Sequence, residues 1–108
     1  MRIILNAKKA GAKAYGEWDA TTGHVVVKQG SVVSQTLSAS PTFRGKKTIE
    51  NLRGQYVSEG IVTTDVLFKS SSTAANFITG RSTNGLIVWK TEDGKTLKEF
   101  INELDKEV

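Results

Sequence analysis

Small or apolar residues alternate strictly with polar ones between Ala12 and Trp18. A period of two places successive side chains on opposite faces of a strand, so this segment predicts a half-buried β-strand. The face opposite the small and apolar residues carries Lys13, Tyr15 and Glu17. A turn cluster follows, and the β-branched run in residues 24–28 predicts the second strand of a hairpin.

Helical spacing begins in the middle of the chain. Apolar residues between Ile49 and Val57 recur at i, i+3, i+7 and i+8, which predicts a helix that begins near Lys47 or Thr48. Gly60 is suited to cap this helix in the left-handed conformation. Residues 61–68 then contain two apolar runs, which fit either one irregular strand or a pair of strands.

The stretch from Phe68 to Leu97 combines several capping and turn signals. Serines at 70–72 followed by alanines at 74 and 75 predict a short helix, which Gly80 is expected to cap. Asn84–Gly85 is typical of a type I′ turn, and it leads into a predicted strand over residues 86–89. In that strand Trp89 is expected to face the core.

Thr96-Leu97-Lys98-Glu99 matches a capping box and predicts the start of a last, amphipathic helix. The elements together predict an α+β fold, with a mainly antiparallel sheet of about five strands and about three helices. We expect residues 1–108 to be one domain, since 108 residues suffice for a single core. Within it, residues 1–9 are expected to be a linker or an edge strand.

Charge is unevenly distributed along the chain. Residues 1–90 carry 12 Lys and Arg against 5 Asp and Glu, whereas residues 91–108 carry 3 against 6. A basic body of this kind is compatible with a polyanionic partner such as DNA. The chain has no cysteine and a single histidine, His24, which excludes disulfides, thiolate sites and multi-histidine metal sites.

Five sequence segments resemble a known family. Residues 80–85 (Gly-Arg-Ser-Thr-Asn-Gly), Trp89-Lys90 and residues 93–97 (Asp-Gly-Lys-Thr-Leu) resemble the signature of domain of unknown function 4357, and residues 14–16 and 23–31 resemble its N-terminal strands. The likeness spans roughly residues 10–100. Ser71, where the family has proline, and Leu86, where an aromatic often follows Asn-Gly, depart from the pattern.

The resemblance implies a setting for the domain. Members typically follow GIY-YIG nuclease or methyltransferase modules, and the family is similar to the RAMA domain, the restriction-enzyme-adenine-methylase-associated domain proposed to bind DNA. We therefore expect a non-catalytic accessory DNA-binding module that acts beside a nuclease or methyltransferase domain in the same or a partner chain. Such a module of a restriction or modification protein could sense modified bases. The alternative is a protein–protein docking module that does not bind nucleic acid.

Candidate DNA contacts are cations and hydrogen-bonding side chains in loops and at helix starts. The serines could hold a phosphate at a helix N-terminus or simply cap the helix, and the asparagine could bond an adenine edge or simply form its turn. The basic residues could neutralise phosphates or form a solvated surface. The set comprises Arg44, Lys46, Lys47, Arg53, Ser70, Ser71, Ser72, Arg81, Asn84 and Lys90.

No catalytic constellation is evident. Glu17, Asp19 and His24 lie close together across the predicted hairpin, but no nucleophile, metal set or phosphate loop accompanies them. We therefore expect no intrinsic catalysis, no cofactor and no metal. No apolar run reaches the roughly 18 residues of a membrane span, so we expect a cytoplasmic domain without membrane contact.

Overall fold

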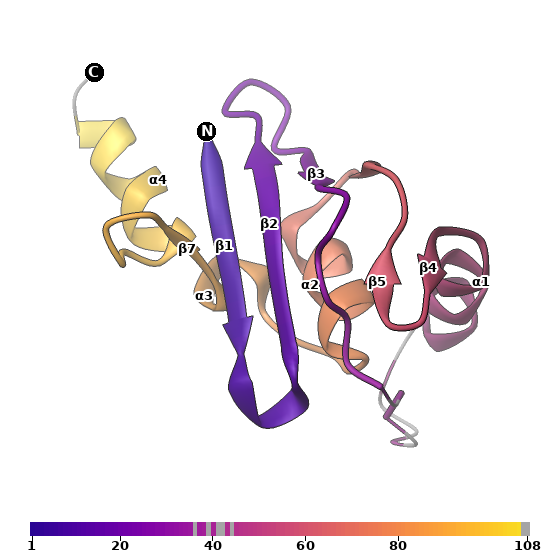
Figure 1. Cartoon of the computed structure of the whole chain (residues 1–108). Helices are drawn as coiled ribbons and strands as arrows, with labels where there is room; N and C mark the ends of the chain where they lie inside the picture. Colours follow the sequence, from indigo (N-terminus) through magenta and orange to yellow (C-terminus); the bar gives the residue numbers. More distant parts are fainter. Residues whose placement is uncertain (36, 39, 41–42, 44, 107–108) are drawn as a thin grey trace.

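The computed structural model describes residues 1–35, 37–38, 40, 43 and 45–106. The described residues form a five-stranded antiparallel sheet, a separate two-stranded ribbon and four α-helices (Figure 1). The elements in chain order are β1 Arg2–Ala7, the 3-10 turn η1 Lys8–Ala10, β2 Ala12–Trp18, β3 Val25–Val27, α1 Lys46–Tyr56, β4 Val57–Ser58, β5 Ile61–Val62, β6 Val66–Phe68, α2 Ser71–Thr79, α3 Gly85–Val88, β7 Trp89–Thr91 and α4 Leu97–Lys106. The predicted α+β class is thus confirmed.

The sheet has the strand order β6-β3-β2-β1-β7. The predicted hairpin is present, with Trp18 of β2 opposite Val25 of β3. β1 is not the edge strand or linker expected for residues 1–9, because it pairs with β2 along its whole length and with β7 on its other side. The first strand of the chain is therefore an inner strand of the sheet, and the edges are β6 and β7.

One face of the sheet is the core face. The alternating residues of β2 that the sequence places inward are buried, and α2 packs against β2, β3 and β6. Ala74 and Ala75 of α2 are fully buried, so their small side chains allow the helix backbone to lie close to the sheet. Figure 1 shows α2 and α3 on this side, with no described helix covering the opposite face.

Residues 85–88 do not form the predicted turn and strand. Asn84 is instead the N-cap of the short helix α3, and its side-chain Oδ1 accepts a 3.0 Å hydrogen bond from the Leu86 amide. Gly85 is buried, and a Cβ atom there would lie 2.2 Å from the carbonyl carbon of Ser71. Glycine is thus required for close backbone packing, which overrides the strand propensity of the Leu-Ile-Val run.

The segment after α1 also differs from the prediction. α1 ends at Tyr56 rather than near Gly60, and β4 and β5 form a ribbon outside the main sheet. Glu59 and Gly60, both at positive φ, form the two-residue turn between them. β5 and β6 therefore belong to different sheets, which settles residues 61–68 as two strands.

The last helix begins as predicted. Thr96 Oγ1 accepts from the Glu99 amide at 3.1 Å, and Glu99 Oε1 accepts from the Thr96 amide at 3.2 Å, which completes the capping box. Phe100 of α4 contacts Trp18 edge-to-face, with ring centroids 6.0 Å apart. Across the described residues, no helix is long and apolar enough to cross a membrane.

Candidate nucleic-acid interface

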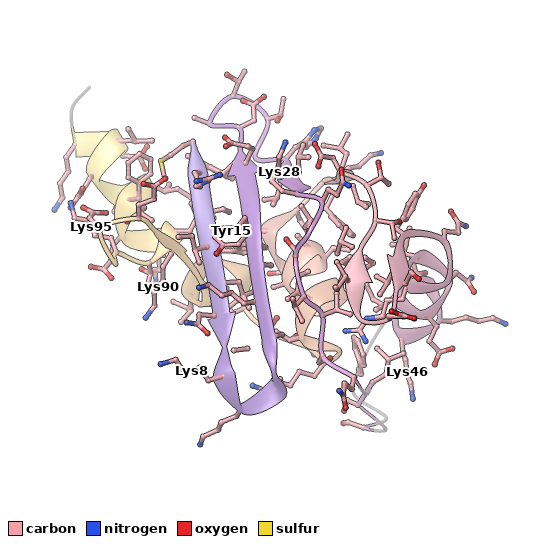
Figure 2. The ribbon with its side chains drawn as sticks, viewed as in Figure 1. Lys8, Tyr15, Lys28, Lys46, Lys90 and Lys95 are labelled. Atoms are coloured by element: carbon pink, nitrogen blue, oxygen red, sulfur yellow. The ribbon has the colours of Figure 1, made fainter. Side chains whose placement is uncertain are left out.

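The uncovered face of the sheet is both basic and partly apolar. Alternation along the strands turns Lys13 and Tyr15 of β2 away from the core, toward the same side as Ile4 of β1 and Lys90 of β7. Lys90, Ile4 and Tyr15 are register partners, so they form one row across three strands. Figure 2 shows Tyr15 over the middle of the β1–β2 hairpin, with Lys90 to one side. We call this surface the open face.

Tyr15 is the aromatic centre of the open face. The Arg2 guanidinium carbon lies 5.7 Å from the Tyr15 ring centroid, and the Lys13 ammonium lies 5.8 Å from it. Both cations are at cation–π distance, on side chains that remain exposed. A half-buried phenol ring with exposed cations around it presents a flat apolar surface beside positive charge.

Lys28 directly follows β3 and lies beside Tyr15, since the Lys28 amide donates a hydrogen bond to the Tyr15 carbonyl. It therefore continues the row of Lys90, Ile4 and Tyr15. Its ammonium is not free, because Nζ bonds Asp65 Oδ2 at 2.7 Å. The Lys28 hydrogen bond, together with a second from the Gln29 amide, lowers the pKa of Asp65 below its ordinary value. The carboxylate therefore stays charged and neutralises this cation.

A second basic surface lies at the tip of the β1–β2 hairpin. Lys8 and Lys9, on the turn η1, line an open pocket of about 610 Å³ together with Gly80 and Arg81 at the end of α2. Gly80 has a left-handed backbone and ends the helix, so it directs Arg81 toward the hairpin turn. Residues more than 70 positions apart in the sequence thus share one pocket.

This pocket adjoins another of about 360 Å³ that reaches the β7 edge. Thr79 and Arg81 line both pockets, and Lys90 lines the second. None of the described residues lining either pocket is acidic. We call the four cations Lys8, Lys9, Arg81 and Lys90 the basic edge.

Carboxylates gather at the opposite end of the sheet. Glu17 and Asp19 line a pocket with Trp18 and Phe100, and Glu92, Asp93 and Glu103 line another nearby. Among the described residues, no group of three His, Asp or Glu could hold a metal ion. The domain therefore has separate basic and acidic ends, as its uneven charge distribution in sequence suggests.

The predicted serines act within the fold. Ser70 caps α2, since its Oγ accepts from the Thr73 amide at 3.1 Å. The Ser71 carbonyl accepts a hydrogen bond from the Trp89 indole, and Ser72 Oγ accepts from the Gly85 amide at 3.0 Å. Capping and packing thus account for the side chains of Ser70 and Ser72, and Ser71 contributes its backbone carbonyl. Trp89 is fully buried, which confirms its predicted place in the core.

Arg53 is directed inward. Its guanidinium donates to the carbonyls of Ser34, Phe77 and Ile78 and to Ser34 Oγ, at 2.9–3.2 Å. Burial lowers the pKa of this guanidinium relative to its ordinary value, but an arginine remains charged at neutral pH. These bonds join α1 to the end of α2, so we assign Arg53 a structural role and leave it out of the proposed interface.

Three further cations were predicted as DNA contacts: Arg44, Lys46 and Lys47. Lys46 and Lys47 are in the first turn of α1, and Figure 2 places Lys46 on the other side of the molecule from Lys90. Arg44 lies outside the described residues. Among the described cations of the predicted set, Arg81 and Lys90 come from separate elements and line one pocket.

Sequence reasoning assigned no binding role to Lys8, Lys9, Arg2, Lys13 or Tyr15. The alternation in β2 does place Lys13 and Tyr15 on one face, so their shared orientation was predictable. The approach of Lys8 and Lys9 to Arg81 depends on tertiary packing, and no local pattern indicates it.

Residues 5–101 match the sequence profile of a family described as Domain of unknown function (DUF4357). The chain belongs to this family. The match includes Lys13, Tyr15 and Lys90 of the open face and all four cations of the basic edge. No curated protein and no solved structure shows significant similarity to the chain. The family is described as one of unknown function, so the membership itself assigns no activity.

Proposed function

We propose that this DUF4357 domain is a non-catalytic accessory module that binds DNA through the basic edge. The observation that carries the proposal is the pair of adjoining pockets lined by Lys8, Lys9, Arg81 and Lys90 without a described acidic residue. Lysine and arginine side chains that converge on an open surface can neutralise successive phosphates and release counterions. The carboxylates at the far end of the domain would orient the basic edge toward a polyanion.

The proposal extends to the setting of the domain. The resemblance to RAMA domains supports a role beside a nuclease or methyltransferase domain, in the same or a partner chain. A preference for methylated adenine rests on that resemblance alone. Equal affinity for matched duplexes with plain and methylated adenine would remove the methylation preference and leave DNA binding intact.

Fluorescence anisotropy with a labelled 20-base-pair duplex tests DNA binding. We expect binding at low salt, with an affinity that falls steeply as salt rises. Arg81→Glu should weaken binding and flatten the salt dependence, because it removes a phosphate contact. Lys98→Glu is the matched control, since it makes the same charge change on the exposed surface of α4. No binding at high micromolar protein, or equal losses in both variants, would overturn the proposal.

A second candidate function is docking to a protein. Leu67 is 60% exposed on β6, and the bridge partners Ile61 and Val32, further along the chain segments that pair there, are 47% and 38% exposed. Exposed apolar side chains at a sheet edge are typical of protein contacts. Docking to one partner should survive nuclease treatment and Arg81→Glu, but should be lost in Leu67→Ser.

A further inference from the structure

The open face differs from the basic edge because it has an aromatic ring at its centre. A duplex buries its bases in the helix, so a protein ring has no base face to contact without unstacking. A single strand exposes its bases, and proteins bind such strands by combining aromatic rings with surrounding cations. The aromatic ring at the centre of the open face therefore favours a single strand over a duplex.

We propose that the open face binds single-stranded nucleic acid, with one base stacked on Tyr15 and the neighbouring phosphates held by Arg2, Lys13 and Lys90. The proposal deepens the proposed DNA binding and rests on it. It makes Tyr15 the residue that distinguishes single strands from duplexes.

The geometry around Tyr15 supports this occupant. Arg2 and Lys13 lie 5.7 and 5.8 Å from the ring centroid, on exposed side chains that can move from the ring to a phosphate. Across the sheet, Lys90 lies two strands away from Tyr15 in the same row. Strands are about 4.8 Å apart, so the two backbones are separated by about 10 Å. Long lysine and arginine side chains can therefore reach phosphates on several sides of a base at Tyr15.

Charge complementarity favours a polyanion on this face over an acidic or neutral protein segment. Glu17 is engaged with the Met1 ammonium at 3.1 Å and Asp65 with Lys28 at 2.7 Å, whereas Glu92, Asp93 and Glu103 line a pocket with Arg2 at the acidic end of the sheet. Arg2, Lys13 and Lys90 have no described carboxylate within ion-pair distance. The open face is also continuous with the basic edge through Lys90, so a strand on Tyr15 can extend onto it.

The chain provides an internal control, because it has two tyrosines and only Tyr15 is on the open face. Tyr56 is the last residue of α1, and Figure 1 shows α1 beside the β4–β5 ribbon, away from β1 and β2. We would label the tyrosine rings for NMR and titrate the domain with a twelve-nucleotide oligothymidine. The comparison ligand is an abasic oligonucleotide of the same length, which keeps the phosphates and lacks the bases.

We expect the oligothymidine to shift the Tyr15 ring resonances upfield and to leave those of Tyr56 in place. The abasic strand should bind more weakly and leave the Tyr15 ring resonances in place. Tyr15→Leu should weaken oligothymidine binding about 5- to 100-fold, the loss typical of one aromatic–base stack, whereas Tyr15→Phe should retain binding. Tyr15 points away from the core, so both variants should fold, which thermal unfolding verifies.

Equal binding of the two strands with no shift at Tyr15 would overturn the single-strand proposal. Equal affinities of Tyr15→Leu and Tyr15→Phe would overturn it as well. If the 20-base-pair duplex still binds through Arg81 in either case, DNA binding at the basic edge stands and only the single-strand proposal fails. If neither oligonucleotide nor duplex binds, both proposals fail.

Discussion

The indole Nε1 of Trp89 donates a 3.0 Å hydrogen bond to the backbone carbonyl of Ser71. This bond ties the strand β7 to the first turn of α2 across the core. Gly85 packs against the same residue, because its backbone lies where no Cβ would fit beside Ser71. Gly85 and Trp89 belong to the segments that resemble the family signature. These segments thus join β7, at the edge of the sheet, to α2 on its core face.

We predict that Gly85→Ala destabilises the domain by about 2–4 kcal/mol, since the new methyl group would meet backbone atoms that cannot rotate away. Gly54→Ala is the control, because Gly54 is inside α1 with no atom within 4 Å of an added Cβ. It should stabilise the domain by about 0.5–1 kcal/mol. Urea unfolding of both variants tests the pair. Equal destabilisation would show that close packing at Gly85 is not the constraint.

Arg53→Met should lower the free energy of unfolding by about 2–3 kcal/mol. The change leaves the partly buried carbonyls of Phe77 and Ile78 without these donors. The affinity of the folded variant for duplex DNA should be unchanged, which anisotropy measures below the unfolding temperature. A loss of affinity without a loss of stability would return Arg53 to the interface that the sequence predicted.

Ser70→Ala distinguishes a cap from a phosphate contact. Removal of an N-cap hydroxyl costs about 1 kcal/mol, so the thermal midpoint should fall. DNA affinity should remain as in the wild type, because Ser70 Oγ is engaged with Thr73. The opposite pattern, with weaker binding and unchanged stability, would identify the serine as a DNA contact.

The Asp65 carboxylate should make stability depend on pH. Its lowered pKa, caused first by the Lys28 hydrogen bond, means that the folded state favours the charged form. The stabilisation is complete above the unfolded-state pKa of about 3.9, and it is lost as the pH falls below that value. Asp65→Asn should flatten this part of the curve. Urea midpoints between pH 6 and 2.5 test this, and parallel curves for wild type and variant would contradict it.

The same substitution should strengthen polyanion binding. Asp65→Asn releases the Lys28 ammonium, which lies in the row of Tyr15 on the open face. We expect a several-fold gain in affinity for oligothymidine at low salt that disappears at high salt. An unchanged affinity at low salt would place Lys28 outside the bound strand's path.

Local patterns predicted the elements that local interactions determine. Alternation identified β2, and the capping box identified the start of α4, because each signal is complete within a few residues. The sequence failed at α3, where the Leu-Ile-Val run favours a strand but Gly85 must pack on Ser71. Tertiary contact there overrides intrinsic propensity.

The candidate site likewise combines residues that the sequence indicates with residues that only tertiary packing brings together. Arg81 and Lys90 were predicted from the family motif, but their association with Lys8 and Lys9 depends on where the hairpin tip meets the end of α2. Arg53 resembles any other cation in sequence, and only its bonds to three carbonyls reveal a structural role.

The position of β1 between β2 and β7 has a consequence for how the protein is made. β1 and β2 can pair as soon as they are synthesised, but Leu5 meets its second neighbour, Trp89, only after the whole intervening segment with α1, α2 and α3 has emerged. Loop closure over such a separation is slow, so the sheet should be completed late and in one cooperative step. Until then the nascent hairpin exposes an unpaired strand edge, and a ribosome that stalls before β7 would leave a product prone to aggregation.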